Sequence, residues 1–178
     1  MTLEELQAFA KTLDPSAKVL IKDGSPFMKF LNFFVQIFNK SFMTRYTTTI
    51  CNRVYVPQNR IGDDLRRLMV HEVGGHVRQC RACGLGTHPW VGFPVYAVLY
   101  LLTFFPLGLA VFRYLFERGA DAKAWRWSLD QGQPVEEVRA RCESFAETVA
   151  SWDYLKPWPK AWVLKGFKKK FEEVVAHG

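Results

Sequence analysis

The sequence predicts an α+β protein in which helices predominate, and three observations support this fold class. The chain has 178 residues, of which 49% are hydrophobic and 23% are charged, so it can bury a sizeable core in one domain. Several long segments repeat their apolar residues at the helical interval. Only two short runs carry the β-branched and aromatic residues that are typical of strands. We therefore expect residues 1–178 to form a single domain with a small sheet.

The first third of the chain is predicted to alternate helices and strands. Residues 2–13 space their apolar side chains as an amphipathic helix does, and residues 17–22 (AKVLIK) are a short strand candidate. Ser25 is placed to cap a helix that has Pro26 in its first turn. Residues 45–57 (RYTTTICNRVYVP) form the best strand of the chain, which the final proline ends.

The rest of the chain is predicted to be helical. A helix begins at Asp63 or Asp64 and is ended by Gly84 and Gly86. A stretch without charge follows over residues 89–112. Three more helices are then predicted, over residues 113–130, over residues 134–155, and after residues 156–160 as far as His177.

The first of these helices carries a motif with the residue types of a metal centre. Residues 71–76 read HEVGGH, with His71 and Glu72 at the start and His76 at the end. Zinc takes nitrogen ligands from histidines on one helix face, and a glutamate beside the first histidine can accept a proton from water next to the metal. The motif therefore predicts a zinc site with Glu72 as the general base.

The spacing of the two histidines requires a local change in the helix. Residues four apart on a regular helix point about 40° apart, whereas residues five apart point about 140° apart and cannot chelate one ion. His71 and His76 are five apart. One extra residue in a π-bulge restores the shared face, and Gly74 and Gly75 would tolerate such a bulge. The sequence therefore predicts a π-bulge between the histidines.

A third metal ligand has three candidates. Glu117 and Asp121 are four residues apart in FERGAD, so they share one face of a predicted helix. His88 is the other candidate, but it lies eleven residues beyond His76 and fits the known spacings poorly. We favour Glu117.

These motifs resemble those of the gluzincin metallopeptidases. HEVGGH matches the H-E-x-x-G-H variant of the dipeptidyl-peptidase III family, and residues 117–121 (ERGAD) fit the E-x-x-A-D helix of gluzincins. Residues 45–125 look like the core of the minigluzincins and of the membrane-bound gluzincin peptidases. The resemblance implies a zincin-like fold with a small antiparallel sheet, an active-site helix, an apolar adaptor hairpin, a Glu helix and C-terminal helices. It also implies that Glu117 binds zinc and that Asp121 orients a ligand histidine.

The conformation of the apolar stretch over residues 89–112 decides whether the predicted metal ligands can meet. It is long enough to span a bilayer, but a single span would separate His71 from Glu117. Glycines and prolines interrupt it, and residues 106–108 (PLG) indicate a turn. We expect these residues to form a hairpin that is buried or dips into a membrane. This hairpin is the candidate surface for membrane or assembly contacts.

The distribution of charge limits the kinds of partner that the protein is expected to bind. The chain has a net charge of +7, and residues 156–178, rich in lysine and tryptophan, supply +4 of it. This tail is either a helix packed by its apolar side or a surface for anionic partners, and no specific nucleic acid is expected.

Cys80 and Cys83 are interpreted as two half-buried thiols, with a structural zinc site as the alternative. The first fourteen residues lack the features of a signal peptide, so a cytoplasmic location is expected.

The predicted function is zinc-dependent hydrolysis of peptide bonds. Tyr114, Arg126 and Tyr154 are candidate donors to the developing oxyanion, and residues 47–56 could pair with an extended peptide substrate. A structural protein of a larger assembly, such as a phage particle, with a vestigial or stabilising zinc site is the alternative. Hydrolysis of a non-peptide amide, such as a cell-wall bond, is a third interpretation.

Overall fold

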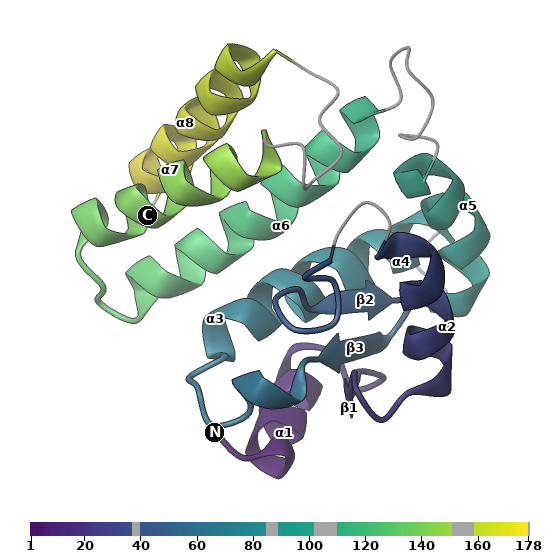
Figure 1. The fold of residues 1–178 in the computed structure, drawn as a ribbon. Helices are drawn as coiled ribbons and strands as arrows, with labels where there is room; N and C mark the ends of the chain where they lie inside the picture. The colour runs from purple at the N-terminus through teal and green to yellow at the C-terminus, as the bar shows by residue number, and fades with distance from the viewer. Residues whose placement is uncertain (37–39, 85–88, 102–109, 151–158, 178) are drawn as a thin grey trace.

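The computed structural model describes residues 1–36, 40–84, 89–101, 110–150 and 159–177, and the statements below refer to these residues. They form a mainly helical α+β fold with one small sheet, so the predicted fold class is confirmed at this level (Figure 1). The elements in chain order are α1 Leu3–Leu13, β1 Lys18–Ile21, α2 Pro26–Val35, β2 Thr48–Ile50, β3 Arg53–Val56, the 3-10 helix η1 Gln58–Arg60, α3 Arg66–Met69, the π-helix η2 Val70–Val77, α4 Arg78–Cys83, α5 Pro89–Leu101, α6 Ala110–Asp130, α7 Val135–Val149 and α8 Lys160–Ala176.

The sheet is mixed, with strand order β1-β3-β2, so the predicted antiparallel sheet is wrong in one pairing. β3 is antiparallel to β2 but parallel to β1, because the chain crosses over through α2 between the first strand and the other two. The single strand predicted over residues 45–57 is instead a hairpin. Cys51 and Asn52 form its two-residue turn, and Cys51 has a φ of 59°. This turn could not be recognised in the sequence because its two residues do not include a glycine.

The two faces of the sheet pack against different helices. Val54 and Val56 of the central strand face α1 and the helical segment from α3 to α4, while Tyr55 faces α2. Residues directly opposite in an antiparallel pair point to the same face, and Thr49 lies opposite Val54. The side chain of Thr49 therefore points toward the helical segment that carries the HEVGGH motif.

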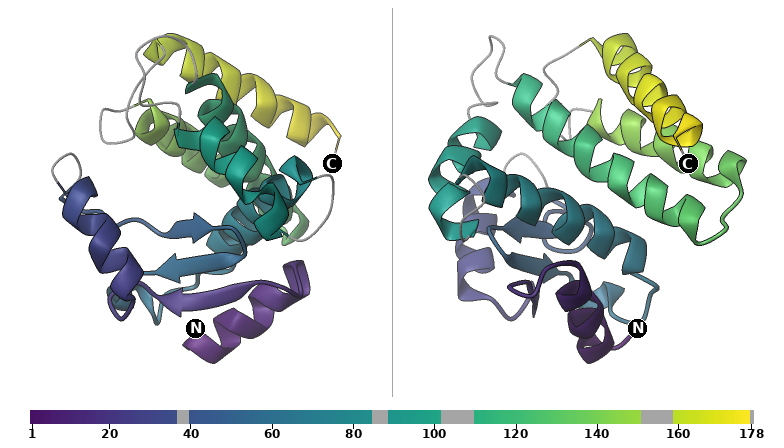
Figure 2. Two further views of the ribbon diagram at one scale, coloured as in Figure 1. Left: turned by 90° about the vertical axis from the view of Figure 1, so that its right-hand side faces the viewer. Right: turned by 180° about the vertical axis from the view of Figure 1, so that it is seen from behind.

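The C-terminal half is a bundle of α6, α7 and α8 that lies on the other side of this helical segment (Figures 1 and 2). Phe167 and Phe171 of α8 are buried and contact the ring of Trp125 on α6. The described part of the basic tail is thus a packed helix, as one of the two interpretations expected.

The apolar stretch forms two helices, α5 and the start of α6, as the hairpin prediction required. Its predicted turn at residues 106–108 lies outside the described residues. Gly92 and Pro94, expected to interrupt the stretch, lie inside α5. A side chain at Gly92 would begin 1.9 Å from the carbonyl oxygen of Cys80, so this glycine permits the close packing of α5 on α4. Among the described helices, none combines the length and the apolar character needed to cross a bilayer.

Lys22, directly after β1, organises the segment that leads into β2. Its side chain is fully buried, and its Nζ donates to the carbonyl oxygens of Phe42 (2.5 Å) and Tyr46 (2.7 Å) and to the hydroxyl of Thr48 (2.9 Å). Burial lowers the pKa of Lys22 from 10.5 to about 7, although Glu72 and Asp23 oppose the change. The buried amine thus fixes residues 42–48 against the sheet.

We expect Lys22 to make the stability of the protein depend on pH. Between pH 7 and 10.5 the unfolded chain keeps a proton on Lys22 that the folded chain has lost, so this group should add up to about 1.4 kcal/mol per pH unit to the slope of the free energy of unfolding against pH. His71, whose folded pKa is raised to about 10, contributes a slope of the opposite sign in the metal-free protein, so the test is the difference between variants. In urea denaturation from pH 7 to 9, the slope should be more positive in the wild type than in Lys22→Met by about this amount. Lys18→Met, at an exposed lysine of β1, should keep the wild-type slope. Equal slopes in all three proteins would contradict the prediction.

Candidate metal centre

The HEVGGH motif lies entirely in the π-helix η2, so the predicted change of helical register is confirmed. It occupies eight residues between two α-helical segments, and the register returns to α-helical at Arg78, whose N–H donates to the carbonyl of Gly75. Lys123 of α6 donates its Nζ to the carbonyl of Gly74 at 2.5 Å. A side chain from the neighbouring helix therefore contributes a hydrogen bond to the backbone of the π-helix.

Only one of the two glycines is sterically required. Neither Gly74 nor Gly75 has a positive φ, so the backbone conformation does not demand glycine, contrary to the expected reason. A Cβ on Gly75 would lie 2.3 Å from the Cβ and 2.7 Å from the Cα of Ala120 on α6, whereas a Cβ on Gly74 would meet only Val70 Cγ1 at 3.6 Å. Gly75 thus allows η2 to touch the helix that carries Glu117.

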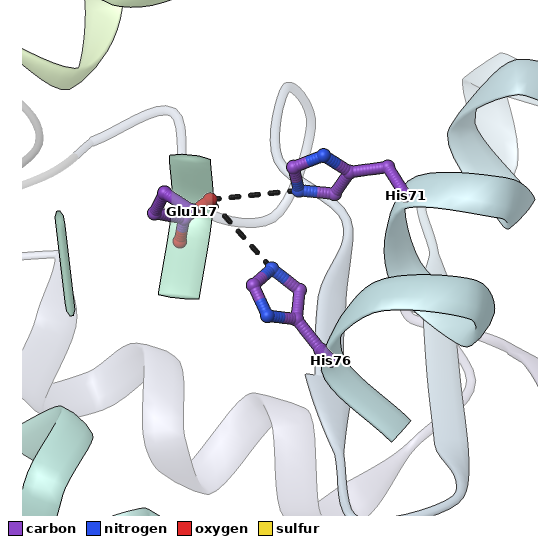
Figure 3. A group of neighbouring side chains, drawn as sticks. All are labelled: His71, His76 and Glu117. Carbon is purple, nitrogen blue, oxygen red and sulfur yellow. Dashed lines mark ion pairs between the residues drawn. The ribbon is translucent and has the colours of Figure 1, made fainter. Parts of the chain in front are cut away.

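Three side chains from these two helices converge. His71 and His76 of η2 both direct Nε2 at the carboxylate of Glu117 on α6 (Figure 3). Glu117 Oε2 lies 3.5 Å from Nε2 of His71 and 3.6 Å from Nε2 of His76, and the potential ligand atoms of all three lie within 4.8 Å of one another. All three residues are buried.

This group fits a metal ion in both spacing and chemistry. Tetrahedral bonds of about 2.0–2.2 Å hold neighbouring ligand atoms roughly 3.3–3.6 Å apart, which matches the two nitrogen–oxygen distances. Two imidazoles and a carboxylate are a ligand set used by divalent cations. His71, His76 and Glu117 could therefore hold a metal ion, as Glu117 was favoured to do.

The two imidazoles carry supporting contacts on Nδ1, the nitrogen that faces away from Glu117. Nδ1 of His71 lies 3.4 Å from Oδ1 of Asp121, which accepts a hydrogen bond from Arg67 at 2.8 Å. Nδ1 of His76 lies 3.0 Å from Oε1 of Gln79 and 3.0 Å from the hydroxyl of Tyr96. Such contacts fix ring orientation and leave Nε2 for a ligand bond.

The electrostatics of the group are strongly coupled. Burial alone would lower the pKa of His71, but the carboxylates of Asp121 and Glu117 outweigh it and raise that pKa to about 10. Burial would likewise raise the pKa of Glu117, yet the two imidazoles hold it well below its usual range. The buried carboxylate is therefore ionised and stabilised by positive charge.

Glu72 lies on the same π-helix but is not part of the ligand group. Its Oε2 accepts a hydrogen bond of 2.6 Å from the hydroxyl of Thr49, so the edge strand β2 holds one oxygen of this carboxylate. Glu72 is only 7% exposed. Glu72 is therefore a buried carboxylate that follows His71 in the chain and is held by the sheet, outside the group of candidate ligands.

The structure places two of the predicted oxyanion donors elsewhere. Tyr114 packs on Phe167 of α8, and its hydroxyl accepts from Arg118 at 3.1 Å. Arg126 donates to the carbonyl oxygens of Val174 and His177 near the end of α8. Both side chains pack within the bundle, and none of these contacts is with His71, His76 or Glu117. The third predicted donor, Tyr154, and the rival ligand His88 lie outside the described residues.

Cys80 and Cys83 belong to an apolar cluster with Cys51, Tyr96 and Phe116, and not to the metal group. Cys83 is half-buried, as the favoured interpretation expected of both thiols, whereas Cys80 is fully buried. Burial raises the pKa of Cys80 to about 12, so its thiol stays protonated at neutral pH.

Sequence reasoning did not single out Thr49, Gln79 or Tyr96. Gln79 had a usable signal, because it follows His76 by three residues on the same helix. Thr49 and Tyr96 had none, since only the tertiary fold brings a strand hydroxyl to Glu72 and a tyrosine of the apolar stretch to His76.

Comparisons of the chain with protein families, with curated proteins and with solved structures found no match.

We expect Asp121→Asn to weaken metal binding about 10- to 100-fold, because the amide cannot support both the His71 ring and the Arg67 guanidinium as the carboxylate does. Titration of the metal-free protein with zinc in competition with a chromogenic chelator would measure the change. Asp130→Asn, at the exposed end of the same helix, should bind metal as the wild type does. Unchanged affinity in Asp121→Asn would show that Asp121 does not support the ligand.

Proposed function

We propose that this protein is a zinc-dependent peptidase with a zincin-like domain. The observation that carries the proposal is the joint placement of the ligand group and Glu72 on the π-helix, with Glu117 delivered by α6. The resemblance of HEVGGH and ERGAD to gluzincin motifs supports the same conclusion. The zinc assignment rests on the nitrogen-rich tetrahedral set and on the presence of a potential general base that a purely structural site does not need.

In the proposed mechanism, His71, His76 and Glu117 would hold the zinc. When bound, zinc would supply a Lewis acid that polarises a carbonyl and favours ionisation of water near neutral pH. Glu72 would accept the proton of the attacking water and then donate it to the leaving amine. The Thr49 hydroxyl, donating to Oε2, fixes the rotamer of Glu72 and leaves its other oxygen for this proton transfer.

The substrate peptide is proposed to pair with β2. This strand lies at the edge of the sheet in the order β1-β3-β2, whereas β3 is the interior strand. An exposed edge offers unpaired backbone groups to an extended peptide. Because Thr49 of β2 contacts Glu72, a peptide added there would run beside the general base.

The test is the metal content of the purified protein together with hydrolysis of casein or a peptide library. We expect about one zinc per chain in the wild type and loss of both zinc and hydrolysis in Glu117→Ala, because that change removes the only carboxylate of the ligand group. Glu136→Ala, an exposed glutamate of α7, should retain both. A wild type that binds no zinc would refute the proposal.

A structural role for the metal is the second candidate, and the burial of the site favours it. His71, Glu72 and His76 are 5–7% exposed, and Glu117 is not exposed. In a scaffold of a larger assembly, zinc would join the sheet layer to the bundle and no hydrolysis would occur. Binding of about one zinc per chain without cleavage of any peptide in the library would indicate this structural role.

A further inference from the structure

Helix α2 exposes four phenylalanine side chains to solvent. Phe27 is 50% exposed, Phe30 64%, Phe33 65% and Phe34 52%. We call these four residues the phenylalanine face. Phe34 makes edge-to-face contacts with Phe30 (5.3 Å between ring centroids) and Phe33 (5.2 Å), so these three rings form one patch. Phe27 lies three residues before Phe30 on the same helix. Contiguous exposed aromatic surface of this kind marks a contact site.

The opposite side of α2 already has its partner. Met28 is fully buried, and Leu31 and Val35 pack with it against Tyr55 of the central strand. A large apolar face of a helix is normally covered by a partner. The core of this protein accounts for only one side of α2, so the phenylalanine face requires a second apolar environment.

The charge around α2 identifies that environment. Residues 24–62 contain five lysines and arginines and no aspartate or glutamate. Lys29, Lys40 and Arg45 are exposed, and none of the three makes an ion pair with a described residue. A second copy of this chain would bring two such basic surfaces together and repel, whereas an anionic surface would attract them.

We propose that the phenylalanine face docks on an anionic lipid surface. The ten residues of α2 are too few to span a bilayer, so the helix lies along the interface. The phenylalanine rings enter the boundary between headgroups and acyl chains, and Lys29, Lys40 and Arg45 lie at the level of the lipid phosphates. This inference does not depend on the metal site or on peptidase activity.

Co-sedimentation of the full chain with vesicles tests the apolar part of the proposal. We expect binding to vesicles of 70% phosphatidylcholine and 30% phosphatidylglycerol, weak binding to pure phosphatidylcholine, and a marked decrease as salt rises. Phe30→Ser/Phe33→Ser should lower the partition coefficient by about tenfold or more, because two rings lose their apolar environment. Val135→Ser, an exposed apolar residue at the start of α7, should leave binding unchanged.

A pair of charge reversals tests which surface is responsible. Lys29→Glu/Lys40→Glu should reduce binding to the anionic vesicles by about tenfold or more. Lys168→Glu/Lys169→Glu makes the same change in net charge on α8, at the far side of the molecule from α2, and should retain most of the binding (Figure 1). All variants replace exposed side chains, so circular dichroism should show wild-type folding.

Three outcomes would overturn the proposal. The first is no binding of the wild type to the anionic vesicles. The second is an equal loss in the two charge-reversal variants, which would assign binding to net charge and not to α2. The third is self-association of the wild type without lipid that Phe30→Ser/Phe33→Ser abolishes, because that would make the phenylalanine face an interface between copies.

Discussion

Gly75→Ala is expected to abolish metal binding and to destabilise the protein by about 3 kcal/mol or more. The new methyl group would begin 2.3 Å from the Cβ and 2.7 Å from the Cα of Ala120, and a backbone atom of a packed helix cannot move away cheaply. η2 and α6 would have to separate, and the histidines would part from Glu117. Zinc titration and urea denaturation of the metal-free protein measure the two effects.

Gly74→Ala is the matched control, because it makes the same chemical change one residue earlier. Its methyl group would meet only Val70 Cγ1 at 3.6 Å, which is ordinary contact. An alanine also lowers the entropy cost of a helix by up to about 1 kcal/mol, so this variant should bind metal normally and be as stable as the wild type or more so. Gly75→Ala/Ala120→Gly should recover only in part, since the Cα at 2.7 Å remains. Equal behaviour of Gly74→Ala and Gly75→Ala would contradict this account.

The sequence was most informative about the register of the helix that carries the candidate ligands. Five-residue spacing of His71 and His76 is incompatible with chelation from a regular helix, so helix geometry predicted a π-bulge between them. The structure has the predicted change of register, but it extends over an eight-residue π-helix and not a single bulge. The reason offered for the glycines was incomplete. Gly75 is needed for an approach between two helices, and a sequence does not show which residue of a distant helix will lie opposite.

Pairings that depend on tertiary structure could not be predicted in the same way. The β-branched composition of residues 45–57 indicated extended backbone correctly but hid the turn at Cys51 and Asn52. The parallel pairing of β1 with β3 depends on the path of α2, which no local pattern encodes. Likewise Tyr96 reaches His76 only because α5 packs on α4.

The other large effect is expected at Glu72. Glu72→Gln should lower kcat/KM for a peptide substrate by about 10²–10⁴-fold, because an amide cannot accept the proton of the attacking water. The zinc content should stay at the wild-type level, since Glu72 is not one of the three converging ligands. The glutamine can still accept the hydrogen bond of Thr49 through its carbonyl oxygen, so the side chain should keep its position. Steady-state kinetics with a fluorogenic peptide and metal analysis of the same preparation measure both quantities.

Glu72→Gln distinguishes the proposed peptidase from a structural protein, because it removes the general base and leaves the three metal ligands in place. In a stabilising zinc site, Glu72→Gln would leave the zinc content unchanged, and the wild type itself would cleave nothing. In the proposed peptidase, KM should change little while kcat falls, since the proton transfer occurs in the transition state and not on substrate binding. Glu136→Gln, at an exposed position of α7, should retain full activity. Full activity of Glu72→Gln would remove this residue as the base, and loss of zinc would show instead that its carboxylate contributes to holding the ion.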